Sequence, residues 1–311
     1  MRGSRLAGLA FVTAMMVVPL LPAASARPGA HAARLSFDFG LIGDQRHTAD
    51  QRSRFPNLVK DMNGADLAFT VHAGGIGRDP AACTDDYYLE TRSLFDHFAA
   101  PLIYTPGDNE WTDCRSGGYD PGERLAALRQ RFFTSDRSAP RSNFTVARQS
   151  PDYPENTRWD FGPATFATLH VVGGDDAVGR GDFAGRRAAN IKWLNATFDH
   201  AERDRNDAVV IIWHADPRFR RDAAPYNDLR GALRARTVRF GKPVVLVHGG
   251  GDGFRVDKPM VDHRGHRVEN FTRVQTFGPS DVHWVRGTFD SSDNGLFTFR
   301  PQIVPANATS R

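Results

Sequence analysis

The chain has 311 residues, enough for one large domain or two ordinary ones, and an ordinary globular composition without low-complexity tracts. Its formal net charge is +4 at pH 7. The basic residues are scattered and form no stripe, which argues against a nucleic-acid-binding protein. The composition therefore indicates a globular protein with a sizeable core, and we predict no nucleic-acid partner.

The first 26 residues have the pattern of a secretory signal peptide. Arg2 and Arg5 form a basic start, Leu6–Leu21 an apolar middle, and Ala24–Ala26 a small-residue cleavage site. A membrane anchor is the alternative, but glycine, threonine and proline interrupt the apolar run. We therefore expect an exported protein, extracellular or periplasmic, whose mature chain has no membrane contact.

The mature chain alternates buried strands with helices. Apolar runs predict strands over Leu35–Ile42, Leu67–His72, Pro101–Thr105, Arg158–Phe161, Thr165–Val172, Ala208–Trp213 and Pro243–Val247. Capping residues predict helices after Thr84 and after Asp120, and apolar residues at helical spacing predict one over Phe183–Arg203. We expect another helix over Asn227–Phe240, and Ala49–Met62 to be helical in part. Short strands follow, from Phe254 to Phe299. This order predicts an α/β fold in which a mixed sheet, covered by helices, packs on a second sheet.

The expected domain boundaries follow from this pattern. Residues 27–33 form a short mature N-terminal segment, residues 34–300 a single domain, and residues 301–311 a C-terminal tail. We find no internal repeat and no linker that would separate two domains.

The two cysteines, Cys83 and Cys114, each lie in a loop just past a predicted strand end. In an exported chain such a pair is typical of a disulfide bond. A free thiol pair or a metal site is the alternative, but no CxxC or His-rich spacing accompanies the two residues. The predicted disulfide would tether two loops at the same end of the sheet.

Five buried strands end in polar or glycine-rich turns. The turns are Gly43-Asp44, Gly74-Gly75, Gly107-Asp108-Asn109, His214-Ala215-Asp216 and the run from His248 to Gly253. In open α/β sheets the ligand site lies at the carboxyl ends of the strands. Carboxylates and imidazoles that converge there from separate strands are the donors of a divalent metal site.

Several motifs resemble the calcineurin-like metallophosphoesterase superfamily. They are FGLIGD, PGDNEWTDC, GGYDPGERL, VLVHG, FRVDKP, FTRVQTFG and VHWVR, between about Ser36 and Phe299. PGDNEWTDC is similar to the third motif of a group of exported bacterial proteins. The resemblance implies a four-layer α/β/β/α sandwich of two mixed β-sheets flanked by helices. It also implies a two-metal centre, phosphoester hydrolysis by a metal-bridging hydroxide, and a small phosphoester or other phosphate-containing ligand.

The resemblance assigns site residues position by position. Asp44 matches the aspartate of the first motif, and Asp108 holds the metal-ligand position of the third motif, an Asn in most members. Asn109 stands where many members have the histidine that protonates the leaving group. His214 matches the metal-binding histidine in the middle of the chain. The last motif should lie at Gly249 to Asp252.

The departures from the family pattern concern the metal ligands. Gly75 stands where the family has the aspartate that bridges both metals. Gly250 replaces the first ligand of the last motif, Asp252 its closing histidine, and Arg46 the second ligand of the first motif. Two divalent ions ~4 Å apart repel by something on the order of 15 kcal/mol at an effective dielectric near 20, and a glycine cannot offset that repulsion. We therefore expect no two-metal centre of the usual kind.

The remaining donors predict at most one divalent ion, Mn²⁺, Mg²⁺, Ca²⁺ or Zn²⁺. Its expected ligands are Asp44, Asp108, His214 and Asp252, and the expected catalytic residues are Asn109 and His248. The alternative is a hydrogen-bonded polar cluster inherited from an ancestor. Two functional hypotheses follow: a metal-dependent phosphoesterase of weak or altered activity, and a catalytically inactive homologue that acts as a binding protein.

Overall fold

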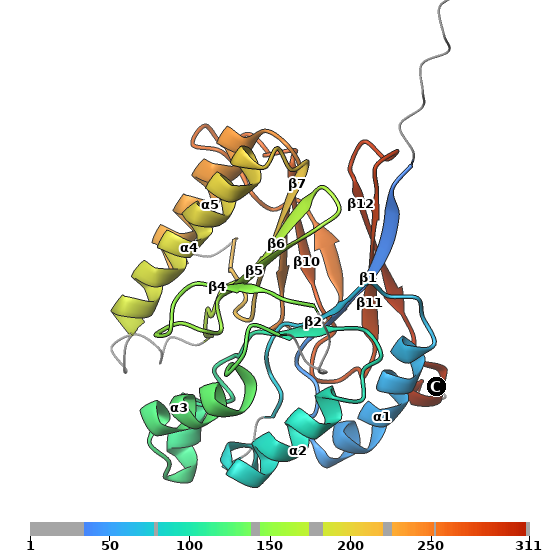
Figure 1. Cartoon of the computed structure of the whole chain (residues 1–311), viewed down its shortest axis with the longest axis vertical. Coiled ribbons are helices and arrows are strands. Elements are labelled where there is room, and N and C mark those ends of the chain that lie inside the picture. The colour runs from blue at the N-terminus through green and yellow to red at the C-terminus, as the bar shows by residue number, and fades with distance from the viewer. Residues whose placement is uncertain are drawn as a thin grey trace, which may run out of the picture. The chain divides into compact units, whose positions relative to one another are not determined.

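Two β-sheets lie face to face, and helices flank them on both sides (Figure 1). The computed structural model describes residues 34–77, 80–137, 144–173, 183–219, 226–251 and 253–308. All of them belong to the unit Arg34–Arg311. The layers therefore run helix, sheet, sheet, helix, as the sequence predicts.

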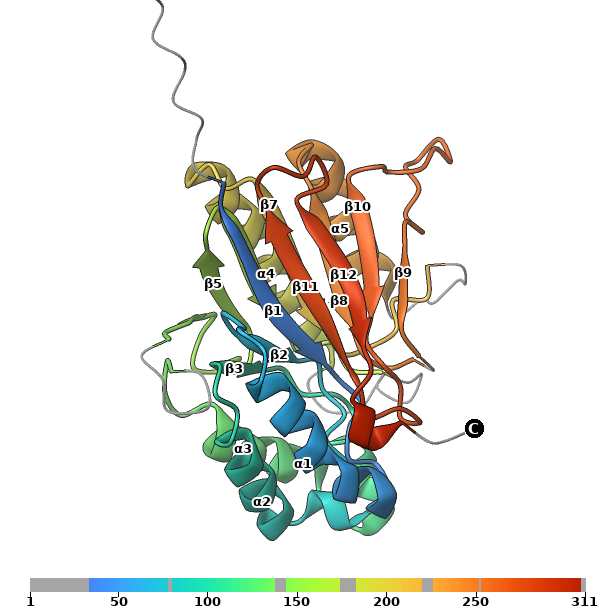
Figure 2. The same cartoon turned by 90° about the vertical axis from the view of Figure 1, so that its right-hand side faces the viewer.

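The first sheet has five strands in the order β12-β11-β1-β2-β3. Its strands are β1 (Ser36–Ile42), β2 (Thr70–His72), β3 (Leu102–Tyr104), β11 (Trp284–Asp290) and β12 (Phe297–Gln302). β1, β2 and β3 are parallel, whereas β11 and β12 are antiparallel additions at one edge. The helices α1 (Ala49–Asn63), α2 (Asp85–Phe95) and α3 (Pro121–Phe132) pack on its outer face (Figure 2).

The second sheet has seven strands in the order β4-β5-β6-β7-β8-β10-β9. Its strands are β4 (Ala147–Arg148), β5 (Thr157–Phe161), β6 (Ala164–Thr168), β7 (Ala208–Trp213), β8 (Val244–His248), β9 (Arg255–Asp257) and β10 (Phe271–Gln275). The central strands β6, β7, β8 and β10 are parallel. The helices α4 (Phe183–Arg203) and α5 (Asn227–Phe240) cover its outer face.

The helices α1, α2 and α3 begin at capping residues; the caps at Thr84 and Asp120 were predicted from the sequence, and the one at Thr48 was not. Thr48 and Gln51 form a capping box at α1, and Thr84 accepts a hydrogen bond from the backbone of α2. Asp120 caps α3, with Pro121 in its first turn. These local signals explain why the predicted and observed helices begin at nearly the same residues.

Three short 3-10 helices complete the described chain: η1 (Pro80–Cys83), η2 (Asp113–Gly117) and η5 (Pro305–Asn307). The disulfide Cys83–Cys114 joins η1 to η2, which confirms the predicted bond. Residues beyond 300, expected to form a tail, continue the fold: β12 runs to Gln302, and η5 contacts α1 through the buried Asn307. None of the helices in the described ranges has the length and apolar composition needed to cross a membrane.

Aromatic side chains fill the space between the two sheets. Phe69 packs at ring-centroid distances of 5.0 to 5.6 Å against Phe39, Trp159 and Phe166, which come from both sheets. Phe39 also contacts Phe166 directly, at 5.5 Å. Edge-to-face and stacked aromatic pairs add to the free energy of burial. This cluster holds the sheets together and therefore the strand ends in register.

We expect Phe166→Ala to lower the free energy of unfolding by about 3–5 kcal/mol, because the ring is fully buried and leaves a cavity between the sheets. Denaturant unfolding measures the change. Leu89→Ala on α2 is the control: Leu89 is 49% exposed, so its loss should cost much less. Equal losses in the two variants would contradict the central place of the inter-sheet cluster.

Candidate functional site

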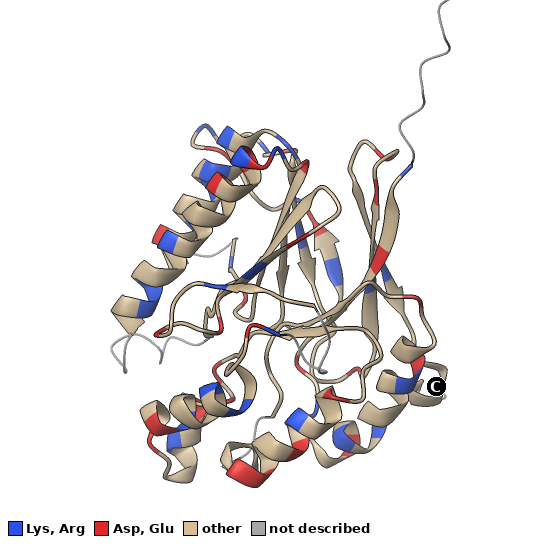
Figure 3. Cartoon of the chain, viewed as in Figure 1, with Lys and Arg blue, Asp and Glu red and all other residues tan. Residues whose placement is uncertain are grey.

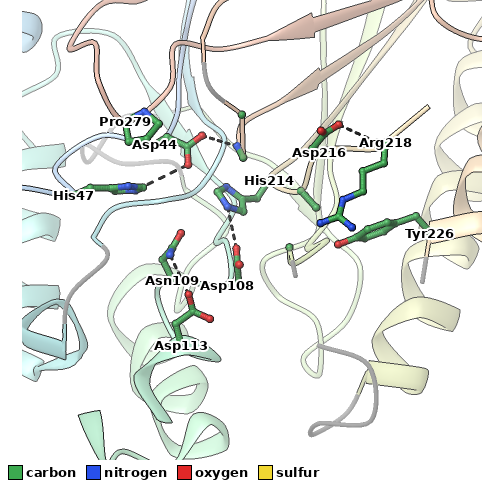
Figure 4. A pocket seen from close by; sticks show the side chains of 14 residues that line it. Asp44, His47, Asp108, Asn109, Asp113, His214, Asp216, Arg218, Tyr226 and Pro279 are labelled. Atoms are coloured by element: carbon green, nitrogen blue, oxygen red, sulfur yellow. Dashed lines mark hydrogen bonds and ion pairs between the residues drawn. The ribbon is translucent and has the colours of Figure 1, made fainter. Parts of the chain in front are cut away.

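A pocket of about 250 Å³ opens where several strands end (Figure 4). Asp44 follows β1, Asp108 and Asn109 follow β3, His214 follows β7, and Gly250 follows β8. All five residues line the pocket. The fold therefore brings together four of the strand-end turns identified in the sequence.

His214 lies at the centre of the pocket wall and is 3% exposed. Its Nδ1 lies 2.9 Å from the carbonyl oxygen of Ala73, which can only accept, so Nδ1 carries a proton. Its Nε2 lies 3.0 Å from Oδ1 of Asp108. Burial alone would lower the pKa of His214, but the contact with Asp108 and the charges of Asp44 and Glu110 raise that pKa to about 10.

Asp108 lines the pocket and forms an ion pair with His214. Its Oδ1 is buried, and the 3.0 Å approach of His214 Nε2 is an ion pair without hydrogen-bond geometry. Burial alone would raise the pKa of Asp108, but His214 outweighs this and lowers it. The carboxylate is therefore ionised at neutral pH and pairs with the protonated imidazole of His214.

Asp44 is buried and lies close to the backbone of Gly250. Its Oδ2 accepts a hydrogen bond of 2.5 Å from the amide of Gly250, and its Oδ1 lies 4.0 Å from Nε2 of His47. Burial raises the pKa of Asp44 to about 6, against the opposing charge of His214. Asp44 is thus fixed by Gly250 on one side of the pocket.

Gly75 leaves no room for a side chain. A Cβ at this position would lie 2.7 Å from Oδ1 of Asp44 and 2.9 Å from its Cα. Gly75 also has φ +77°, a left-handed conformation that favours glycine. The loop therefore has no space for the bridging carboxylate that the family places here.

Glu110 supplies no replacement for that carboxylate. It is fully buried, and its Oε1 accepts hydrogen bonds from the amides of Gly75 and Ile76 and from the hydroxyl of Tyr104. Its Oε2 accepts a hydrogen bond of 3.1 Å from the amide of Gly107. Four donors occupy the carboxylate, so it holds two loops together and does not face the pocket.

Arg46 points away from the pocket. Its guanidinium donates hydrogen bonds to Thr91 and Glu90 on α2 and lies 4.9 Å from the ring centroid of Tyr87. Arg46 is therefore part of the core beneath α2. Its guanidinium does not line the pocket.

The other predicted site residues differ in their positions. His248, expected to be catalytic, is fully buried at the end of β8 and does not line the pocket. Burial lowers the pKa of its imidazole to about 4. Asp252, an expected metal ligand, lies outside the described residues. Asn109 lines the pocket, where its amide donates to Asp113.

The described donors do not fit one metal ion as they stand. Ligands of one ion must lie within about 4.8 Å of one another, because bonds to divalent ions are about 2.0–2.4 Å long. Asp44, Asp108 and His214 do not meet this condition together. Asp108 Oδ1 and His214 Nε2 alone show the spacing of neighbouring ligands on one ion. The described site therefore fits neither a two-metal centre nor a three-ligand single site.

Among the described residues, one group of three donors does lie within that distance, on the surface far from β3 in the chain: Asp160, His200 and Asp204. Nε2 of His200 lies 2.7 Å from Asp160, whereas its Nδ1 lies 3.2 Å from Asp204 and 2.8 Å from Arg203. The two carboxylates thus approach different edges of the imidazole. This arrangement is an exposed ion-pair cluster.

Sequence reasoning missed part of the pocket wall. Arg218 and Tyr226 line it beside Asp216, and His47 and Asp113 line it near Asn109 (Figure 4). Asp216 stood in a strand-end turn that we had noted, so its place carried a signal. Arg218 and Tyr226 follow in loop positions without a motif, and only the fold places them here.

A buried polar network supports the loop after β3. Nε1 of Trp111 donates to Nε2 of His170, whose Nδ1 lies 2.7 Å from Glu155. Glu155 also accepts two hydrogen bonds from Arg129. His170 must therefore be neutral with its proton on Nδ1, and burial lowers its pKa to about 4. The guanidinium of Arg186 lies 4.3 Å from the ring centroid of Trp111 and covers it.

Comparisons with known proteins agree with this fold. No protein-family model and no curated protein matches the chain. A dimetal phosphatase from Danio rerio is 13% identical and has a TM-score of 0.53. The match covers 86% of this chain and 96% of the phosphatase chain. The purple acid phosphatase PPD1 from yellow lupin seeds is 12% identical and has a TM-score of 0.53. The match covers 92% of this chain and 54% of the phosphatase chain. GAP50, the anchor in the inner membrane complex of Plasmodium, is 9% identical and has a TM-score of 0.53. The match covers 88% of this chain and 86% of the GAP50 chain.

At such low identity the likeness shows the fold alone. The fold is that of metallophosphoesterases, with two mixed sheets flanked by helices. The predicted fold class is thereby confirmed. The roles predicted for the individual site residues stay predictions.

We expect Gly75→Ala to lower the free energy of unfolding by about 2 kcal/mol or more, because the left-handed backbone and the contact with Asp44 both oppose a Cβ. Gly118→Ala is the matched control: Gly118 has φ +85° but open space around it, so it should cost only about 1–2 kcal/mol. Denaturant unfolding measures both. If Gly75→Ala costs no more than Gly118→Ala, the close approach of Asp44 is refuted.

Glu155→Gln should lower the free energy of unfolding by about 3–5 kcal/mol at pH 7, because it removes the charged partner of Arg129 and of His170. Burial alone would raise the pKa of Glu155, but the bonds from His170 and Arg129 lower it from 4.5 to about 2. The contribution of the ionised carboxylate is complete above about pH 4.5 and is lost as the pH falls toward 2. The difference between parent and variant should therefore shrink over that range in urea titrations.

Asp207→Asn serves as the control for this substitution. Asp207 pairs with Lys242 on the surface, where both side chains are about half exposed, so its loss should cost only about 0–1 kcal/mol. A Glu155→Gln loss as small as that of Asp207→Asn would mean that the network does not stabilise the loop.

Proposed function

We propose that this protein uses a metallophosphoesterase fold to bind a ligand and has lost two-metal phosphoester hydrolysis. The observation that carries the proposal is the packing at Gly75, where Asp44 occupies the space that a bridging carboxylate would need. Without a bridging carboxylate, two closely spaced divalent ions have nothing between them to offset their repulsion. The engagement of Glu110 by four donors supports the same conclusion.

The fold itself is compatible with such a role. Solved structures with this architecture include two phosphatases, and also GAP50, which is described as an anchor. The architecture therefore does not require hydrolysis. The pocket, in contrast, is retained and reaches the surface at the strand ends.

A second candidate function rests on one specific observation. Oδ1 of Asp108 lies 3.0 Å from Nε2 of His214, whose Nδ1 is held by the carbonyl of Ala73. This is how a metal-ligating histidine is usually oriented. It favours a single divalent ion, held weakly, and a phosphoesterase of weak or altered activity. Asp44 would have to move to complete such a site.

We further propose that the protein acts outside the cytoplasm. The disulfide Cys83–Cys114 supports this, because disulfides persist in oxidising compartments. The signal-peptide pattern of the first 26 residues points in the same direction. Its membership of the exported bacterial group with the PGDNEWTDC motif remains part of this proposal.

Elemental analysis of the purified mature chain after Mn²⁺ loading and dialysis tests the two candidates. We expect less than one retained ion per chain and no hydrolysis of a phosphomonoester or a phosphodiester above the buffer blank. The reason is that the described donor atoms of the pocket lie too far apart to bind one ion together. One tightly retained ion with metal-dependent turnover would favour the weak phosphoesterase. Two ions per chain would contradict the loss of the two-metal centre.

A further inference from the structure

His170 is a fully buried imidazole whose two ring nitrogens have different roles. Its Nε2 lies 3.1 Å from Nε1 of Trp111, and an indole N–H can only donate. Nε2 must therefore present its lone pair. Nδ1, which lies 2.7 Å from the carboxylate of Glu155, carries the single proton. The hydrogen bonds thus require a neutral imidazole.

The indole that donates to His170 is attached to the pocket wall. The backbone amides of Trp111 and Asp113 both donate to the carbonyl oxygen of Asp108, at 3.1 and 3.2 Å. Asp108, Asn109 and Asp113 line the pocket (Figure 4). We call residues 108–113 the pocket-wall turn. The position of the Trp111 indole therefore bears directly on the shape of this turn.

Burial and charge oppose a second proton on the ring of His170. The titratable side chains around it are Glu155, Arg129, Arg186, Arg187 and Tyr226. Arg129 donates two hydrogen bonds to Glu155 and so offsets part of the charge of that carboxylate. The guanidinium of Arg186 lies 4.3 Å from the ring centroid of Trp111 and repels an imidazolium. Burial and the two guanidiniums outweigh Glu155 and lower the pKa of His170 to about 4.

We propose that His170 is a pH-sensitive latch on the pocket-wall turn. A proton taken up from solvent at Nε2 removes the acceptor of Trp111, because the new N–H points at the indole N–H. The indole then leaves His170, and the turn opens. Glu110 holds Gly107 and the disulfide holds Cys114, so the opening is confined to the residues between them. The latch acts on the wall itself and does not depend on what the pocket binds.

The direction of the pH effect follows from the two states of the latch. In the open turn solvent reaches His170, and the pKa of its imidazole returns toward the ordinary 6.5, whereas in the closed turn the pKa is about 4. The closed turn is therefore fully favoured above pH 6.5 and is progressively lost as the pH falls toward 4. Between pH 7 and pH 5 the ratio of open to closed turn should rise by up to about twentyfold.

Two measurements on the full mature chain between pH 7 and pH 5 test the latch. In a chain labelled with 5-fluorotryptophan, the fluorine resonance of Trp111 is the one that Trp111→Phe lacks, and we expect it to shift as the pH falls. Hydrogen–deuterium exchange, corrected for its intrinsic pH dependence, should become faster across the pocket-wall turn by up to about twentyfold. A fluorine resonance and a corrected exchange rate that stay constant over this range overturn the proposal.

His170→Gln separates the latch from other pH effects. Its amide oxygen can still accept from Trp111, but the side chain does not titrate, so the corrected exchange of the turn should not change with pH. His97→Gln is the matched control: His97 is exposed, its Nδ1 lies 2.8 Å from the carbonyl oxygen of Ser93, and its loss should leave the parent behaviour intact. A pH dependence in His170→Gln equal to that of the parent overturns the latch.

Trp111→Phe decides the question if His170→Gln fails to fold. Without the indole N–H there is no bond for a proton on His170 to break. The turn of this variant should exchange faster than that of the parent at pH 7 and show no further increase at pH 5. A parent-like rise in exchange in Trp111→Phe overturns the proposal, since the pH effect would then arise elsewhere.

Discussion

The buried carboxylate of Glu110 is the interaction on which the site depends. It lies between the loop after β2 and the loop after β3 and accepts hydrogen bonds from both, at Gly75, Ile76 and Gly107. Hydrogen bonds to a charged group stabilise by about 1.5–3 kcal/mol each, and the loss of the acceptor would leave buried amides without a partner. Burial raises the pKa of Glu110, although the charge of His214 and these hydrogen bonds oppose the shift.

This interaction explains why the pocket has its present chemistry. Because Glu110 draws the backbone of Gly75 inward, the loop passes so close to Asp44 that a side chain has no room. Glu110 also accepts a hydrogen bond from the amide of Gly107, which lies against the ring of His214. A Cβ at Gly107 would lie 2.6 Å from Cδ2 of His214. His214 is thereby held between the backbone and Asp108. The site is a compact set of ion pairs and hydrogen bonds.

The loop after β3 is supported from its other side as well. Trp111 joins it to His170, which follows β6 of the second sheet, and the disulfide at Cys114 joins it to η1. Supports from both sheets and from a covalent bond restrict how far Asp108 can move. Figure 3 shows acidic residues among the loops where the two sheets meet, as well as mixed charge along the outer helices. The described pocket lining includes four carboxylates, although the net charge of the chain is positive.

Much of the fold could be predicted from the sequence because its signals are local. The helix caps at Thr84 and Asp120, the apolar run of β7 and the periodicity of α4 each depend on neighbouring residues only. The strand-end turns likewise mark Asp44, Asp108 and His214 as site residues. The shorter strands β2 and β3 were predicted too long, because hydrogen-bond pairing with a neighbour, and not apolar character, decides where a strand ends.

The directions of side chains were decided by tertiary structure alone. Arg46 and His248 stand near motif positions, yet one packs under α2 and the other is enclosed at the end of β8, because burial depends on which element covers each residue. Arg218 and Tyr226 reach the pocket from a loop that carries no motif. The sequence by itself determined the layers of the fold, the disulfide and the strand-end residues. Only the packing of loops from two sheets decided that Glu110 is occupied, that Gly75 has no room for a side chain, and that four carboxylates share one cavity.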